Sequence, residues 1–357
     1  MFTMSDSFTK LTYQTLQQSK NLFALAHKNV SSSLWGLIYP NQSQVKPAPP
    51  ETLLKMQQKY NELMETDWQD AEEGIYSVDV LFDNPWGDFL RYYPMVCLDL
   101  PSIWERARQK KYQDFAPEIS TEGYPSYYTQ NFHHQTDGYL SDLSANLYDL
   151  QVEILFGGAA DAMRRRILAP LRKMVNKWQI LGESCRQVRI LDVACGTGRT
   201  LKLIRQSLSQ PSLYGVDLSP AYLRKANELL SQIPGELPQL LQANGEELPF
   251  LDDYFHAVTC VFLFHELPPS ARQRVIEQAF RVTKPGGTFI ICDSIQMDDS
   301  PEFEPLMENF QKVYHEPYYR HYSTDNLVKR LENAGFQQIE IQVHFASKYL
   351  VAQKPSE

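Results

Sequence analysis

The stretch VRILDVACGTGRT, residues 188–200, joins an apolar run of strand length to a glycine-rich turn and then to a helix. Nucleotide-binding folds of alternating strands and helices begin in this way. A dinucleotide site would need a third glycine where Leu201 stands, and a phosphate loop would need a Gly-Lys-Ser/Thr ending, which is absent. The turn therefore favours a nucleotide-like ligand that brings no phosphate to the loop, although it could also be only a tight turn.

Apolar runs of strand length alternate with helical stretches from residue 188 onward. This rhythm predicts a Rossmann-like, doubly wound α/β fold with a seven-stranded sheet. The last two runs, FQQIEIQVHF and SKYLVAQK, are almost adjacent, so they predict an antiparallel hairpin at the sheet edge. The other expected strands are 188–194, 212–218, 237–243, 257–264 and 287–294, and the expected helices are 200–208, 220–232, 270–282 and 324–334.

Polar residues stand on or after three of these strands. Asp192 lies within the first strand, and a ligand ammonium would explain a buried carboxylate there. Asp217 ends the second strand, where it could accept both hydroxyls of a ribose or cap the next helix. Asn244 follows the third strand and could pair with an amino-purine edge or be a turn residue. Ammonium, ribose and adenine without phosphate describe S-adenosylmethionine.

These motifs resemble the core of class I S-adenosylmethionine-dependent methyltransferases, most closely the ubiquinone/menaquinone C-methyltransferase-like group. ILDVACGTGR resembles motif I, LYGVDLS the ribose motif, ANGEELPF the adenine-side motif, FLFHELP the segment after strand four, and RVTKPGGTFIICD the turn before strand five. Asn244 stands where the family often has Asp, and Gly245 replaces the usual Ala. The resemblance covers about residues 145–353. It implies S-adenosyl-L-methionine as cofactor, held by Asp192, Ala194, Gly196, Thr197, Gly198, Asp217, Leu218, Asn244, Gly245 and Phe262.

Two aromatic and histidine-rich stretches are candidates for the substrate side. Residues 131–149 contain FHHQTDGY, which we interpret as a lid or an ordinary capped loop, and SANLYD, whose Tyr148 and Asp149 resemble a family motif over the cofactor. Residues 315–323, HEPYYRHYS, offer substrate contacts or a surface helix. We name His265, His134 and Tyr148 as catalytic candidates. His265 is the first choice for a base, with Glu266 and His134 as alternatives, but it could instead only order its turn.

Composition excludes some classes of function. A net charge of −9 argues against a dedicated nucleic-acid binder, and the run Arg164, Arg165, Arg166 is expected to be a solvated helix face. The five cysteines are scattered, which indicates a reduced compartment, the cytoplasm, with no structural zinc and no metal ligands. No apolar run is long enough for a transmembrane segment.

The first 165 residues are mostly outside the resemblance. We divide the chain into an arm and linker (1–50), a mostly helical extension with the lid (51–165), and a methyltransferase domain (166–357) with a substrate-side insertion at about 298–322. Residues 7–28 predict an amphipathic helix that packs on the body or contacts a membrane. A linker at 41–50 precedes a helix at 51–72, and residues 74–128 receive no assignment. The expected apolar stripe of the first helix is Phe8, Leu11, Leu22 and Ala26.

The sequence predicts an enzyme that methylates a small molecule, lipophilic or aromatic in character. Two alternatives stay open. The chain could methylate protein or RNA and use its N-terminal region for docking, or it could bind S-adenosylmethionine without catalysis. The substrate, the methylated atom and the oligomeric state do not follow from the residues.

Overall fold

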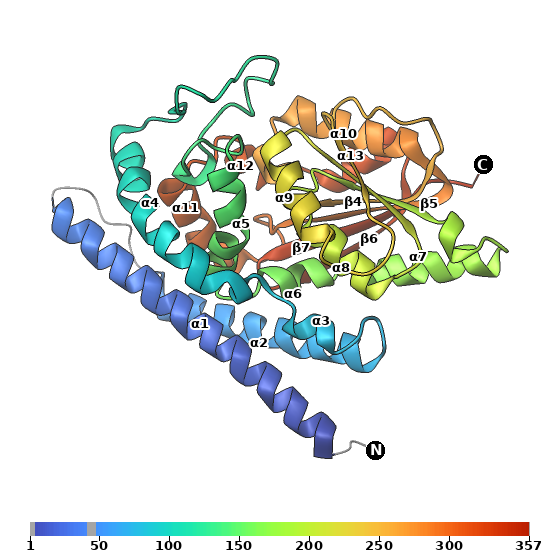
Figure 1. Cartoon of the computed structure of the whole chain (residues 1–357), viewed down its shortest axis with the longest axis horizontal. Helices are drawn as coiled ribbons and strands as arrows, with labels where there is room; N and C mark the ends of the chain where they lie inside the picture. The colour runs from blue at the N-terminus through green and yellow to red at the C-terminus, as the bar shows by residue number, and fades with distance from the viewer. Residues whose placement is uncertain (1–3, 41–47, 357) are drawn as a thin grey trace.

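The computed structural model describes residues 4–40 and 48–356, so most of the predicted linker lies outside the described residues. Its centre is a seven-stranded sheet in the order β3-β2-β1-β4-β5-β7-β6 (Figure 1). The strands are β1 (Arg189–Val193), β2 (Ser212–Asp217), β3 (Gln239–Gln242), β4 (Phe255–Val261), β5 (Thr283–Ser294), β6 (Gln337–His344) and β7 (Ser347–Gln353).

The predicted fold class is confirmed. Strands β1 to β5 pair in parallel, while β7 is antiparallel to both β5 and β6. The expected hairpin therefore forms, with β6 at the edge and β7 one strand further in. The carboxyl ends of β1, β2 and β4 lie side by side, which is where ligands bind in doubly wound sheets.

The predicted helices of the sheet region are also present, together with one helix before β1 that was not predicted. α7 (Leu168–Ile180), α8 (Arg199–Ser207) and α9 (Pro220–Leu230) lie with β1 residue Ile190 in one hydrophobic core, and α10 (Pro269–Val282) and α13 (Leu327–Ala334) lie with its neighbour Leu191 in the other. Successive residues of a strand face opposite sides, so the inner strands β1, β4 and β5 are buried on both faces. The helices α11 (Glu304–Val313) and α12 (Tyr319–Tyr322) follow β5.

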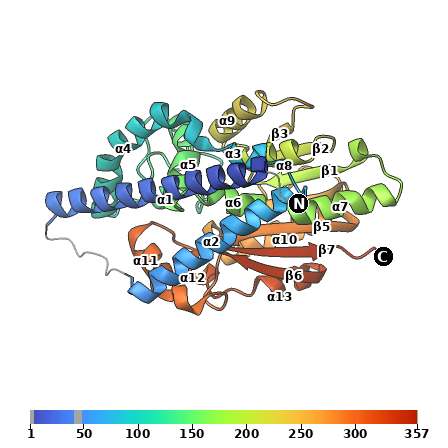
Figure 2. The same cartoon turned by 90° about the horizontal axis from the view of Figure 1, so that it is seen from below.

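The N-terminal region is helical and lies against the sheet domain (Figures 1 and 2). Its order is α1 (Met4–Ile38), α2 (Pro50–Glu72), α3 (Asp79–Phe82), α4 (Phe89–Gln109), α5 (Asp142–Leu155) and α6 (Ala160–Arg165). Figure 2 shows α2 crossing between α1 and the edge strand β6, and both neighbours contact it. The unassigned stretch 74–128 contains α3 and α4. The prolines Pro94 and Pro101 lie inside α4, and because proline is unfavourable within a helix, the sequence did not indicate one there.

The packed face of α1 differs from the predicted one. Tyr13 and Lys20 are buried, with Tyr13 donating from its hydroxyl to Asp67 of α2 at 2.5 Å. The predicted stripe of Phe8, Leu11, Leu22 and Ala26 is exposed instead. The prediction was wrong because polar side chains such as Tyr13 and Lys20 occupy the buried face of α1, and hydropathy patterns do not register this. Within the described residues, no helix has both the length and the apolar character that crossing a membrane requires.

The arginine run of α6 is buried, not solvated as predicted. Arg165 forms a two-point ion pair with Asp67, Nε–Oδ1 2.8 Å and Nη2–Oδ2 2.6 Å, and Arg166 pairs with Asp70. Arg164 pairs within its own helix. Because Asp67 and Asp70 both belong to α2, the ion pairs of Arg165 and Arg166 attach this helix to the domain.

Candidate functional site

The glycine turn joins β1 to α8 through left-handed backbone. Ala194, Gly196 and Gly198 have φ of 57°, 53° and 79°, a region that favours glycine. A Cβ on Gly198 would lie 2.9 Å from the Cβ of Ala226 on α9. The turn therefore needs glycine at position 198 both for its backbone and for the close approach of α9.

Asp217, at the end of the neighbouring strand β2, is hydrogen-bonded to the backbone of the glycine turn. Its Oδ2 accepts a hydrogen bond from the Gly196 N–H at 2.9 Å, and its Oδ1 accepts one from the Ser219 N–H at 2.8 Å. Burial raises the pKa of Asp217 to about 6, against the opposing effect of these two hydrogen bonds. Ser219 caps α9, because its side chain accepts from the Tyr222 N–H. The cap role considered for Asp217 is thus filled by another residue.

Asp192 is buried inside the sheet. Its Oδ1 accepts a hydrogen bond from Thr259 Oγ1 of β4 at 2.6 Å, while burial raises the pKa of Asp192 to about 7. The sequence suggested that a ligand ammonium explains this carboxylate. The structure supplies a partner within the protein, so its burial does not require a ligand.

A narrow pocket lies at the carboxyl ends of β1, β2 and β3. Five of the predicted cofactor residues line it: Ala194, Asp217, Leu218, Asn244 and Gly245. The remaining wall is apolar or aromatic except for Glu266, and it includes Val193, Leu263, Leu267, Val275, Tyr127, Tyr128 and Phe132. The cavity volume is about 50 Å³, room for a few water molecules.

The other predicted cofactor residues stand outside the pocket wall. Gly196, Thr197 and Gly198 form the turn, and Thr197 Oγ1 donates to both oxygens of Asp149 at 3.0 and 2.9 Å. Asp192 lies in the sheet, as described above. Phe262 stacks on Phe156 with ring centroids 6.1 Å apart, in left-handed backbone after β4.

His265 is held beside a buried carboxylate. Its Nδ1 lies 2.6 Å from Oδ1 of the buried Asp293, whose Oδ2 accepts from the Phe264 N–H. Burial alone would lower the pKa of His265, but the Asp293 carboxylate outweighs burial and raises it to about 9. A protonated imidazole cannot accept a proton, so this geometry favours the turn-ordering role over the base role.

The other two catalytic candidates also lie beside the pocket wall, not in it, within the described residues. Burial, with the nearby His315, lowers the pKa of His134 to about 4, and its ring lies 6.0 Å from that of Tyr112. Tyr148 packs edge-on against Tyr139 and Tyr222, at centroid distances of 6.0 and 5.5 Å. Tyr148 therefore supports the aromatic segment over the pocket.

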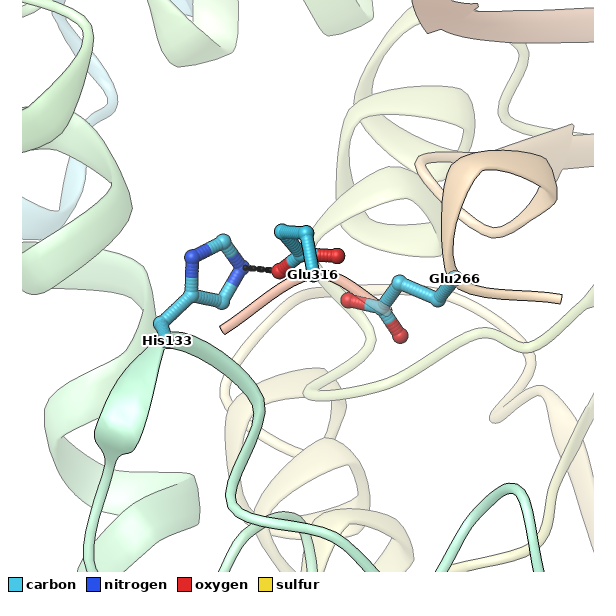
Figure 3. A group of neighbouring side chains, drawn as sticks. All are labelled: His133, Glu266 and Glu316. Carbon is cyan, nitrogen blue, oxygen red and sulfur yellow. Dashed lines mark ion pairs between the residues drawn. The ribbon is translucent and has the colours of Figure 1, made fainter. Parts of the chain in front are cut away.

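An acidic cluster adjoins the pocket at Glu266. Tyr139 donates its hydroxyl to Glu266, and beyond Glu266 lies the pair of His133 Nε2 and Glu316 Oε1, 3.0 Å apart (Figure 3). Burial, with the Glu316 charge, raises the pKa of Glu266 to about 7. Burial would lower the pKa of His133, but Glu316 raises it overall.

Several residues of the site were missed in the sequence. Tyr127 and Tyr128 lie in the stretch that received no assignment, although aromatic density after two prolines was a usable signal. Glu316 stands within residues 315–323, where its aromatic and basic neighbours drew attention instead. Of those neighbours, Tyr319 is buried and bonds Ser294 at 3.0 Å between hydroxyl oxygens.

Comparison with known proteins agrees with the fold and the turn. Residues 190–287 match a family described as a methyltransferase domain. The chain is 33% identical over 132 residues to the ubiquinone/menaquinone biosynthesis C-methyltransferase UbiE of Yersinia enterocolitica and 32% identical to that of Proteus mirabilis. Each match covers 36% of this chain and 48% of the relative, so the chain spans about half the length of these curated relatives. Residues 190–287 of the chain thus form a methyltransferase domain.

The solved structures to which the chain is similar are more distant in sequence. Phosphoethanolamine N-methyltransferase 2 of Haemonchus contortus is 15% identical, with a TM-score of 0.38 over 52% of each chain. A SAM-dependent methyltransferase from Aquifex aeolicus is 21% identical, with a TM-score of 0.36 over 50% of this chain and 88% of that one.

Proposed function

We propose that this protein is an enzyme that transfers the methyl group of S-adenosylmethionine to a small molecule. One observation carries the proposal: the Asp217 carboxylate and the Asn244 side chain line one pocket beside the glycine turn. A carboxylate acceptor, a side-chain amide and tightly turned backbone at neighbouring strand ends form the set of polar groups that suits a nucleoside without phosphate.

The residues present fit the cofactor. Asp217 has acceptor capacity left for ribose hydroxyls after its two backbone hydrogen bonds. Asn244 would meet the adenine edge, with Leu218 and Val275 as apolar walls for the ring. S-adenosylmethionine, when bound, supplies an already activated methyl group. The protein is then required mainly to position the acceptor and to exclude water.

The acceptor is proposed to be lipophilic or aromatic. Tyr127, Tyr128 and Phe132 line the pocket, and aromatic faces suit both planar molecules and the cationic sulfonium. The relatives named above act, by their names, in ubiquinone and menaquinone biosynthesis. We propose that the segment 124–140 is a lid, because the space beneath it must widen to admit a nucleoside.

A reducing compartment such as the cytoplasm remains the proposed location. All five cysteines are free thiols, three of them buried. The net charge of −9 supports a small-molecule substrate over a nucleic acid.

Calorimetric titration with S-adenosylmethionine and then S-adenosylhomocysteine tests the cofactor. We expect both to bind, and we expect Asp217→Asn to weaken binding by about tenfold or more, because hydrogen bonds to a charged group contribute about 1.5–3 kcal/mol. The matched control Asp142→Asn changes an exposed carboxylate, 64% exposed, and should leave binding unchanged. Equal affinity of wild type and Asp217→Asn would remove Asp217 from the ribose site.

A further inference from the structure

Three side chains from distant parts of the sequence meet at the pocket wall. They are His133 on the short helix η2 (Phe132–His134), Glu266 on η4 (Phe264–Glu266), and Glu316 in the loop between α11 and α12. One nitrogen or oxygen atom of each lies within 4.8 Å of the other two, and Figure 3 shows Glu316 between His133 and Glu266. Ligand atoms about 2.1 Å from a common ion lie up to about 4.2 Å apart, so small side-chain rotations would complete such a set.

The Glu316 carboxylate is buried, and among the described residues it lacks the hydrogen bonds that a buried carboxylate normally accepts. Its side chain is 0% exposed, and within the part of the chain that the structure describes neither oxygen has a hydrogen-bond partner. His133 Nε2 lies 3.0 Å from Oε1, an ion-pair distance without hydrogen-bond geometry. A buried charge is costly unless it is paired and hydrogen-bonded or coordinates a metal. Glu316 thus has coordination capacity that the protein itself does not use.

Hydrogen bonds and ring stacking connect the segments that carry His133 and Glu316. The His133 N–H donates to the carbonyl oxygen of His315 at 3.2 Å, and His315 Nε2 lies 2.6 Å from Gln130 Oε1. The ring of Tyr112 stacks on that of His315 with centroids 3.9 Å apart. Fixed backbone on both sides keeps the ligand atoms close before any ion arrives, as a binding site requires.

We propose that His133, Glu266 and Glu316 bind one divalent cation. One imidazole and two carboxylates suit Mn²⁺, Fe²⁺ or Zn²⁺, and the remaining coordination positions would be open to water or to an oxygen of a bound molecule. The expectation of no metal ligands arose because these residues show no metal-binding spacing; they are separated by 133 and 50 positions. Glu266 lines the same pocket as Asp217 and Asn244, but neither of those two residues belongs to the cluster.

Manganese binding tests the site without cofactor or acceptor. The full chain is stripped with a chelator, dialysed and titrated with Mn²⁺, while electron paramagnetic resonance measures the free ion. We expect one ion per chain, and we expect Glu316→Gln and His133→Gln each to weaken binding by roughly tenfold or more. The matched control Glu340→Gln removes an exposed carboxylate, 57% exposed, and should bind as wild type does.

Two further measurements keep the result interpretable. Thermal unfolding checks that each variant is folded, and Mn²⁺ should raise the melting temperature of wild type but not of Glu316→Gln, because an ion that binds only the native state stabilises it. Asp217→Asn should bind Mn²⁺ normally, which separates failure of this site from failure of the proposed function. The proposal is overturned if folded wild type binds no Mn²⁺, or if Glu316→Gln binds it equally well.

Discussion

Asp217 shows how burial makes a single carboxylate sensitive to pH. Its folded-state pKa of about 6 lies above the ordinary 3.8, so the ionised form destabilises the empty site at neutral pH. That cost declines as the pH falls through about 6 and is absent below 3.8. Ribose hydroxyls would donate to the ionised form and therefore favour it.

We expect the affinity for S-adenosylmethionine to fall as the pH is lowered from about 7.5 to about 5.5, as Asp217 takes up its proton. Calorimetry across this range measures the change. Asp192 also titrates near 7, so the profiles of Asp217→Asn and Asp192→Asn are compared. A wild-type profile that persists in Asp217→Asn would contradict the assignment.

Gly198 combines a backbone requirement with a packing requirement. We expect Gly198→Ala to lower the free energy of unfolding by about 2–4 kcal/mol, since it adds both left-handed strain and an overlap with Ala226. Gly182→Ala is the matched control, because Gly182 has φ of 94° but nothing within 4 Å of an added Cβ. Chemical denaturation should show a smaller loss there, and equal losses would mean that the overlap is relieved.

At the scale of elements, the buried pair of Arg165 and Asp67 joins α6 to α2. The hydroxyls of Tyr13 on α1 and Tyr76, which follows α2, donate to the same carboxylate at 2.5 and 2.7 Å. The Asp67 side chain therefore links α1, α2, α6 and the segment after α2. Fully buried pairs add specificity of docking, and removing one partner leaves the other uncompensated. The N-terminal helices are thus placed by polar groups inside an apolar interface.

We expect Arg165→Met to lower the free energy of unfolding by about 3–5 kcal/mol, because the buried Asp67 would lose its cationic partner. Arg224→Met is the control: Arg224 pairs with Asp142, and both side chains are more than 60% exposed. An exposed pair contributes about 0–1 kcal/mol. Urea denaturation of both variants distinguishes the two environments, and similar losses would refute the docking role of Arg165.

At the scale of the whole molecule, α1 stabilises a domain whose pocket it does not enter. Tyr13 belongs to the same hydrophobic core as Ile190 of β1, whereas the residues that line the pocket all follow position 126. We expect a chain lacking residues 1–40 to melt at a lower temperature but, where folded, to bind S-adenosylmethionine with unchanged affinity. Calorimetry below the melting transition checks the second part, and lost affinity would show that α1 shapes the site.

The sheet was predictable because each of its signals is local. Runs such as residues 188–194 and 287–294 are apolar on both faces, and the helical stretches between successive runs leave few topologies. The glycine turn and Asp217 follow from the same logic, since the end of a strand fixes where its next side chains point. Phe262 and His265 are next in sequence to the pocket residues Leu263 and Glu266. Their own contacts are instead with Phe156 and Asp293, which lie far away in the sequence.

The sequence by itself determined where the strands lie, the glycine turn and the kind of ligand that the turn suits, because these depend on residues close together in the chain. Only the tertiary structure decided which face of α1 is buried, that the arginine run pairs with α2, and that Glu316 meets His133 and Glu266. In each of these cases a polar group is buried through a partner far away in the sequence. The free energy of such burial depends on the partner, so composition and periodicity within one segment cannot reveal it.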